Sequence, residues 1–577
     1  SLVLLDLGKL EEAEESILKA IKLKPSYSES FTILATVLNQ QGKQQKALQC
    51  FIKAVRIDKN EYNSYPLVVQ FLQYVNPNEL NKNNLKEILM LLLKRNDISH
   101  KQLFSSFNSL YEREIIFFGE KNKLVYINDK SIQQFLNDEF LIQAMKKISF
   151  RDLRWEALFT KIRRILLLTI SEKSNSRNNN NLKFVYSLAE QCFLNEYVYS
   201  ITPEESKCVK KLINELNIIH SSEIHIAIIS CYTPLYKLED KIELINKFKS
   251  NDKNFKELIK LQLIEPLNEI SLAKTIKTIG IINDNISKKV KSQYEENPYP
   301  RWRYGNPPGL QKFNIDKIIN NEIRPNYINQ DLYNDKLKIL IAGCGTGYQI
   351  LQTQRYKNSI ITAIDLSSSS LAYAERKINE LKINNVKLIQ MDILEIDLLG
   401  ETFDLIECGG VLHHMKDPIK GLTSLLKVLK VGGFLKLGLY SELGRSDIVK
   451  ARQYIERKKL LSTEENIRIF RETVFSSYNK NLSNLKNRGN FYTISECRDL
   501  CFHAQEHRFT INQLIQILSS NQLQFLGFLL PEAVKSFYKN YFPEDKKQTN
   551  LQNWAKLEEQ HMKTFSGMYQ LWVYKGE

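Results

Sequence analysis

Three glycines and an aspartate occur where short apolar segments end, a pattern typical of a nucleoside-binding site. The apolar segment 336–342 runs directly into Gly343, Gly345 and Gly347. Glycine lets the backbone turn tightly and leaves room for a ligand to lie against it. Asp365 ends the next apolar segment, where a carboxylate can accept hydrogen bonds from both ribose hydroxyls. The glycine spacing by itself leaves a dinucleotide site and a simple tight turn open as alternatives.

Three further segments follow in the order that such a site requires. The third apolar segment ends in Asp392 and is followed by Ile393, where the adenine edge of a nucleoside would be read. The fourth apolar segment is followed by GGVLHHMKDP at 409–418, and the fifth is preceded by KVLKVGG at 427–433. The chain therefore carries a complete series of landmarks and not an isolated glycine motif.

Over residues 336–441 these landmarks resemble the class I S-adenosylmethionine-dependent methyltransferases, especially the group with an LHH segment after the fourth strand and a VLKxGG turn before the fifth. An NAD-binding fingerprint would place its third glycine one residue later, where this chain has Tyr348. One departure is Lys430-Val431-Gly432, where the family usually has proline before the paired glycines. This departure affects the rigidity of the turn and not the chemistry.

The resemblance implies S-adenosyl-L-methionine as the cofactor and assigns its contacts position by position. The three glycines would border the methionine moiety, Asp365 would hold the ribose, and Asp392 with Ile393 would contact the adenine. Cys408 and Gly409 would face the methyl-donor end. Capping of the strand ends is the alternative role for both aspartates. The expected cofactor-binding residues are Gly343, Cys344, Gly345, Gly347, Asp365, Leu366, Asp392, Ile393, Cys408 and Gly409.

A sulfonium already carries a good leaving group, so the protein mainly has to align a nucleophile with the methyl group and exclude water. A general base is optional. We expect His413, His414, Tyr440 and His507 as candidate catalytic residues; the last lies in CFHAQEHRF, which also contains His503 and Glu506. Histidines of the LHH segment can alternatively serve the structure near the cofactor.

A zinc site is a second possible use of residues in the same region. Cys497, Cys501, His503 and His507 have the side-chain types that suit tetrahedral coordination. All four fall within eleven residues that are expected to form a helix and a loop, with no separated pairs of ligands. We therefore expect ordinary packing at these positions and no metal.

The elements that must position these residues follow an alternating pattern. Apolar, β-branched segments alternate with helical stretches, which is typical of a parallel sheet with helices on both faces. Two last segments are expected to close the sheet as an antiparallel hairpin, which completes a seven-stranded, Rossmann-like α/β fold. The expected strands are 336–342, 359–365, 386–392, 403–408, 433–441, 522–530 and 568–575.

The first residues show a period of thirty-four. Gly8, Ala13, Ile17 and Ala20 recur as Gly42, Ala47, Phe51 and Ala54. This period resembles the tetratricopeptide repeat, in which small residues lie where two antiparallel helices cross closely. The first repeat lacks its opening helix, so we expect the chain to begin inside a longer array. Such a short array either binds a protein partner or consists of packed helices alone.

The fold class is therefore multidomain, with an all-α N-terminal half of repeats and further helices followed by the α/β methyltransferase. NPYPRW at 297–302 and an insertion at 442–510 are expected to form the acceptor pocket, with Tyr299 and Trp302 as substrate-binding residues. The alternative is that these two aromatics pack the seam between domains. The expected domains are 1–60 (repeats), 61–290 (helical region), 291–331 (linker rich in proline and aromatics) and 332–577 (methyltransferase).

Composition and charge distribution exclude some of the remaining classes of function. The 577 residues carry a net charge of +16 that is spread thinly, without a dense basic stripe. No apolar segment approaches the roughly 20 residues that span a bilayer. Eight scattered cysteines indicate free thiols and a reducing, cytoplasmic location. We expect no membrane partner.

The sequence limits the classes of molecule that could accept the methyl group but does not identify the acceptor. The chain has no (D/N/S)PP(Y/F) after the fourth strand and no Pro-Cys nucleophile, so no nucleic acid is expected. A small molecule or a protein side chain remains, and the repeats favour a protein or a protein-held substrate. We expect an S-adenosylmethionine-dependent methyltransferase. The alternative is a repeat-based scaffold with a vestigial nucleotide-binding domain.

Overall fold

The computed structural model describes residues 2–58, 64–120, 130–172, 181–217, 222–306, 311–329, 336–476 and 480–576. The chain divides into two compact units. Unit 1 consists of Ser1–Pro266 and Arg303–Leu310, and unit 2 consists of Leu267–Trp302 and Gln311–Glu577. The expected helical region 61–290 spans both units, because its part from Leu267 onwards belongs to unit 2.

Unit 1 begins with helices that follow the thirty-four-residue period. Gly8 and Gly42 adopt φ values of +74° and +76°, so the recurring glycine marks a left-handed turn between helices. The recurring Ala13 and Ala47 are completely buried, which lets the neighbouring helices pack closely. The four helices are α1 (Leu2–Asp6), α2 (Leu10–Leu23), α3 (Ser28–Gln40) and α4 (Gln44–Ile57).

The rest of unit 1 is helical in the part of the chain that the structure describes. Its core contains an aromatic cluster around Trp155, whose ring lies 4.8 Å from that of Phe150 and 5.2 Å from that of Phe159. The main helices are α5 (Ser64–Tyr74), α6 (Lys82–Leu93), α7 (Phe104–Leu110), α8 (Glu112–Glu120), α9 (Lys130–Leu136), α10 (Glu139–Met145), α11 (Leu153–Glu172), α12 (Leu182–Leu194), α13 (Pro203–Glu215), α14 (Glu223–Ser230), α15 (Ile242–Lys247) and α16 (Lys253–Ile259).

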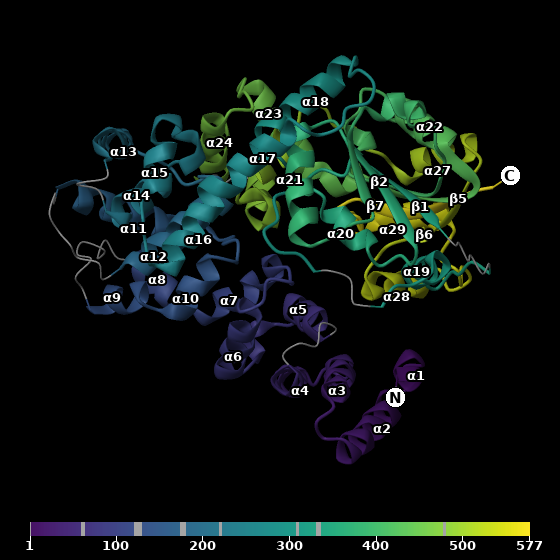
Figure 1. Ribbon diagram of the computed structural model, residues 1–577. Coiled ribbons are helices and arrows are strands. Elements are labelled where there is room, and N and C mark those ends of the chain that lie inside the picture. Colours follow the sequence, from purple (N-terminus) through teal and green to yellow (C-terminus); the bar gives the residue numbers. More distant parts are fainter. Residues whose placement is uncertain are drawn as a thin grey trace. The chain divides into compact units, whose positions relative to one another are not determined.

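Unit 2 contains a seven-stranded sheet in the order β3-β2-β1-β4-β5-β7-β6 (Figure 1). The first five strands in this order are parallel, whereas β7 runs antiparallel to both of its neighbours. The expected seven-stranded α/β sheet is confirmed. The strands are β1 (Leu337–Ala342), β2 (Ser359–Asp365), β3 (Val386–Gln390), β4 (Phe403–Gly409), β5 (Leu429–Leu439), β6 (Leu523–Phe528) and β7 (Tyr569–Lys575).

Helices cover both faces of this sheet, which explains why its central strands are apolar throughout. Leu340 and Ala342 of β1 belong to one buried cluster, together with residues of α22, α27 and α29. Ile339 and Ile341 belong to the opposite cluster, with residues of α19, α20 and α21. The covering helices are α19 (Ile315–Glu322), α20 (Tyr348–Thr353), α21 (Ser368–Glu380), α22 (Pro418–Val428), α27 (Ile511–Ser520) and α29 (Leu551–Gln560).

Two details of the sheet differ from the sequence pattern. β5 begins at Leu429, ahead of the paired glycines, because Leu429 pairs with Phe403 of β4 before the register of the two strands shifts. Gly432, at φ +77°, lies within the strand. The strands β6 and β7 are antiparallel neighbours as expected. They are joined through α28 (Glu532–Tyr541) and α29 instead of a short turn.

The other helices of unit 2 come from two segments that lie before and after the sequence of the five parallel strands. One segment precedes β1, and the other lies between β5 and β6, within the expected insertion 442–510. These helices are α17 (Glu265–Ala273, which begins in unit 1), α18 (Asn285–Glu296), α23 (Ser446–Arg457), α24 (Glu464–Ser476), α25 (Lys480–Ser483) and α26 (Ile494–Cys501).

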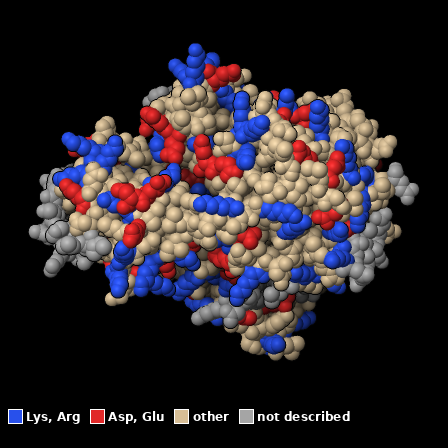
Figure 2. All heavy atoms as spheres, turned by 45° about the horizontal axis from the view of Figure 1, so that its top comes forward, with Lys and Arg blue, Asp and Glu red and all other residues tan. Residues whose placement is uncertain are grey.

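The surface agrees with the dispersed charge seen in the sequence. Figure 2 shows Lys and Arg interspersed with Asp and Glu over the face in view. Within the described residues, no helix is both long and apolar enough to cross a membrane.

Candidate functional site

The glycine loop connects β1 to α20 at the carboxyl end of the parallel strands, where ligands bind in open α/β sheets. Gly345 has φ +51°, and a Cβ atom there would lie 2.8 Å from the carbonyl oxygen of Tyr299. Gly347 has φ +83°, and its Cβ would lie 2.8 Å from that of Ala374 on α21. The loop therefore requires glycine both for its backbone conformation and for close packing.

Asp365, the last residue of β2, is tied to this loop. Its Oδ2 accepts a hydrogen bond from the backbone N–H of Gly345 at 2.8 Å, and its Oδ1 accepts one from Ser367 at 2.9 Å. Burial raises the pKa of this carboxyl above its ordinary value, and the backbone N–H donors oppose that shift. Each carboxylate oxygen keeps a further lone pair for another donor.

A cavity of about 810 Å³ opens beside the loop, and all of its lining residues belong to unit 2. Its volume lies within the range of small-molecule sites. Eight of the ten expected cofactor-binding residues line it: Gly343, Cys344, Gly345, Asp365, Leu366, Asp392, Ile393 and Gly409.

The other two expected cofactor-binding residues lie outside the lining. Gly347 forms the N-cap of α20 and packs against α21. Cys408, on the central strand β4, is buried in the apolar cluster that includes residues of α22, α27 and α29. Asp392 both lines the cavity and caps the following 3₁₀ helix, because its Oδ1 accepts the N–H of Leu394 at 3.0 Å. Capping and cavity lining are therefore compatible at this position.

The segment before the sheet lies against the glycine loop. Tyr299 and Pro300 line the cavity, and the hydroxyl of Thr346 donates to the carbonyl oxygen of Pro300. The indole Nε1 of Trp302 donates to the Thr346 carbonyl at 3.1 Å. Trp302 thus supports the loop from outside the cavity, whereas Tyr299 faces into it. Glu295 extends the contact, because its carboxylate accepts the first backbone N–H groups of α21 at Ser368 and Ser369.

Only two of the four candidate catalytic side chains line the cavity. His414 and Tyr440 do so, at the end away from Asp365 in the order of the strands. His413 is completely buried and stacks on the Tyr440 ring at 3.7 Å, while neither of its ring nitrogens has a hydrogen-bond partner. Burial lowers the pKa of His413 well below its ordinary value. His507 lies outside the lining, with its Nε2 3.0 Å from the side-chain nitrogen of Gln505.

Several polar lining residues had no signal in the sequence. Tyr294 belongs to α18 and Asp499 to α26, more than two hundred positions apart along the chain. Arg445 follows β5, lies 3.7 Å from the centre of the Tyr440 ring and pairs with the fully buried Glu506 at 2.6 Å. Residues this far apart fall in no motif, because only the fold brings them together.

The four residues that the sequence offered for a zinc site are not the group that the fold brings together. Cys497 and Cys501 are buried on α26. Within the described residues, one group could offer metal ligands, and it consists of His414, Asp499 and His503. One ligand atom from each lies within 4.8 Å of the others. Neither cysteine belongs to this group.

Comparisons with known proteins agree with the domain interpretation. A family profile described as a methyltransferase domain matches residues 340–437, and one described as a tetratricopeptide repeat matches residues 1–27 and 28–61. The methyltransferase match covers β1 to β5 and therefore contains the glycine loop and Asp365. It confirms the predicted methyltransferase domain over these residues.

Similar proteins cover parts of the chain. An uncharacterized protein of Synechococcus sp. is 34% identical over 205 residues, which are 33% of this chain and 48% of that protein. A ubiquinone biosynthesis O-methyltransferase of Saccharophagus degradans is 24% identical over 113 residues, 20% of this chain and 48% of that protein. A tRNA U34 carboxymethyltransferase of Campylobacter curvus is 27% identical over 173 residues, 30% of this chain and 57% of that protein.

The chain spans about half the length of the curated relatives it matches. Among solved structures, PKMT2 from Rickettsia typhi in complex with AdoHcy is 20% identical, with a TM-score of 0.33 over 42% of this chain and 49% of that one. The comparisons thus show a methyltransferase domain at residues 340–437 and a match to tetratricopeptide repeats at residues 1–61.

Proposed function

We propose that this protein transfers a methyl group from S-adenosylmethionine to a small-molecule or protein acceptor. The observation that carries the proposal is the cavity of unit 2, into which the glycine loop, Asp365 and Asp392 all face. The same strand ends lie within the matched methyltransferase domain. A dinucleotide would need a longer loop before the helix, and Tyr348 occupies that position.

The residues present fit an adenosyl sulfonium compound. Gly343 and Gly345 leave backbone exposed to the cavity, which suits the methionine moiety. Asp365 keeps a free lone pair on each oxygen for the ribose hydroxyls. Asp392 and Ile393 line the next part of the cavity and suit the adenine. When bound, this donor supplies a methyl group on a good leaving group.

The remaining lining residues would then orient the acceptor and exclude water. His414, Tyr440 and Tyr299 line the cavity beyond the positions assigned to the donor. A nucleophile held there in line with the methyl group would need little other assistance. His413 supports this wall through its stack on Tyr440, and His507 donates its backbone N–H to the His413 carbonyl at 2.7 Å. We assign positioning roles to these two histidines.

The repeats support a protein partner, because tetratricopeptide arrays present helical surfaces to other proteins. All eight cysteines are free, which supports a reducing, cytoplasmic location. The face in view in Figure 2, where charges of both signs are interspersed, gives no support for a nucleic-acid acceptor.

Calorimetry with S-adenosylhomocysteine tests the proposed function. We expect micromolar binding to the full chain and loss of binding in Asp365→Ala, because the substitution removes the ribose acceptor and the loop contact. Asp397→Ala is the matched control, since Asp397 pairs with Lys427 on the surface of the same unit. Absence of binding to the unmodified chain would contradict the proposal. Incubation with labelled donor and cell extract would then identify the class of acceptor.

A further inference from the structure

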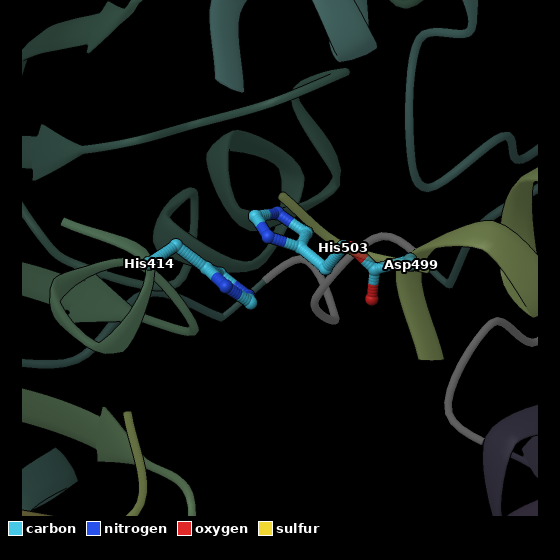
Figure 3. A group of neighbouring side chains, drawn as sticks. All are labelled: His414, Asp499 and His503. Carbon is cyan, nitrogen blue, oxygen red and sulfur yellow. The ribbon is translucent and has the colours of Figure 1, made fainter. Parts of the chain in front are cut away.

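A group of polar side chains lies at the end of the cavity away from Asp365. It combines Tyr294 from α18, His414 from the segment after β4, and Asp499 and His503 from α26 and the residues after it. Figure 3 shows the two histidines side by side, with Asp499 beyond His503. Their rings stack at 3.6 Å. The histidines and Asp499 are buried, and Tyr294, His414 and Asp499 line the cavity.

The hydrogen bonds of His503 fix where its proton lies. Its Nδ1 accepts the backbone N–H of Gln505 at 3.2 Å, so the proton of the neutral ring is on Nε2. That Nε2–H faces the hydroxyl oxygen of Tyr294 at 3.1 Å. The Tyr294 hydroxyl in turn donates to Oδ1 of Asp499 at 2.7 Å. His503 and Tyr294 therefore form one chain of donors that ends on the Asp499 carboxylate.

His414 has the opposite tautomer. Its Nδ1 lies 2.7 Å from the carbonyl oxygen of Gln505, which can only accept, so Nδ1 carries the proton. Nε2 is then the nitrogen with the free lone pair. Burial lowers the pKa of His414 to about 4, so the ring is neutral near pH 7. His414 lines the cavity, and Nε2 is its nitrogen that can accept a proton.

The same hydrogen bonds argue against a metal ion in this group. A histidine that binds a metal through one nitrogen almost always donates the N–H of the other. His414 meets this condition, but His503 does not, because its Nδ1 accepts a backbone N–H. Binding a metal through Nε2 would leave His503 without a proton on either nitrogen. The group is better suited to proton transfer than to coordination.

We propose that His414 accepts a proton in a subsite for the methyl acceptor, and that Asp499, Tyr294 and His503 support it there. The acceptor is a hydroxyl or amine that still carries its proton when it attacks the methyl group. This inference rests on the proposed function. As the acceptor heteroatom bonds to the methyl carbon, the carbon–sulfur bond breaks and its electron pair stays on sulfur. The acceptor proton passes to Nε2 of His414. Asp499 balances the resulting imidazolium charge, and Tyr294 and His503 are positioning residues.

The surroundings of Asp499 make its charge sensitive to pH. Burial raises the pKa of this carboxyl to about 6, and the Tyr294 hydrogen bond and the charge of Arg445 oppose that shift. Below that pH the carboxyl gains a proton and the counter-charge is lost. The titratable and charged groups that face it are Tyr294 from α18, His414, Tyr440 and Arg445 from the segments after β4 and β5, and Glu496, His503 and Glu506 from α26 and the loop after it.

The first test measures methyl transfer from labelled S-adenosylmethionine to the acceptors in cell extract. We expect Asp499→Asn to lower the rate about 100-fold and Tyr294→Phe about tenfold, with S-adenosylhomocysteine affinity unchanged. The rate of the unmodified protein should fall as the pH decreases through about 6, and Asp499→Asn should lack this fall. Tyr538→Phe is the matched control, because that hydroxyl donates to Asp545 at 2.6 Å outside the cavity lining.

Equal rates and equal pH profiles in both variants would overturn the inference while leaving the proposed function intact, since donor binding and transfer would persist. A second measurement does not need the acceptor. NMR spectra of protein labelled with ¹⁵N at histidine should show His414 protonated at Nδ1 and His503 at Nε2. Addition of Zn²⁺ should leave these signals unchanged. Zinc-dependent shifts of both rings that disappear in Asp499→Asn would show a metal site and overturn the inference.

Discussion

The two ends of the cavity in unit 2 are built in different ways. The end proposed to bind the cofactor, called the cofactor end here, uses the ends of consecutive strands from Gly343 to Ile393, with the segment at Tyr299 against its glycine loop. The far end draws on α18, the segments after β4 and β5, and the residues around α26. A site made from neighbouring strand ends follows from the sheet itself. A site made from remote segments depends on how the added helices pack.

The largest effect is expected for a substitution at the far end of the cavity, where it should lower the free energy of unfolding. Glu506→Gln would remove the carboxylate that pairs with the buried Arg445, so we expect a loss of about 3–5 kcal/mol in the free energy of unfolding. Denaturant titration measures this loss. Glu464→Gln is the control, because its pair with Arg468 on α24 is half exposed and worth less than about 0.5 kcal/mol. Equal stability of the two variants would show that the far end does not depend on this buried pair.

A change in the loop should mainly affect the cofactor end. Gly345→Ala places a Cβ 2.8 Å from the Tyr299 carbonyl oxygen at a positive φ. We expect S-adenosylhomocysteine affinity to fall about 100-fold, since strain of this kind costs about 1–3 kcal/mol and displaces the loop. Calorimetry checks the result. Gly400→Ala is matched to it, with φ +64° and no neighbouring atom within 4 Å, and should bind normally.

The smallest effect is expected where the preceding segment supports the loop. Trp302→Phe removes one hydrogen bond to the Thr346 carbonyl and keeps most of the aromatic surface. We expect about a fivefold loss of S-adenosylhomocysteine affinity, because a single hydrogen bond contributes about 1 kcal/mol. Trp554→Phe, which removes a hydrogen bond to Gln548 outside the cavity lining, serves as the control. A loss of affinity equal to that of Gly345→Ala would show that Trp302 contributes more to binding than one supporting hydrogen bond.

The comparison also explains which residues could be predicted. Asp365 was recognisable because a strand end and a glycine loop have a fixed spacing, and the structure joins the two by a hydrogen bond. Tyr294 and Asp499 were not recognisable, since nothing in a tyrosine on one helix and an aspartate on another indicates that they meet. His414 was predictable from the sequence in one respect and unpredictable in another. Its segment was identified from the sequence, but its tautomer depends on the Gln505 carbonyl, ninety-one positions away.

The sequence by itself determined the repeats, the seven-stranded sheet and the loop and strand ends that line the cavity near Asp365, because periodicity, strand patterns and loop chemistry act over a few neighbouring residues. It did not determine the length of β5 or the helices between β6 and β7, where local signals compete with packing. Tertiary structure alone decided which residues form the far end of the cavity. The physical reason is that burial, charge pairing and proton position depend on groups that are neighbours in space and not in the chain.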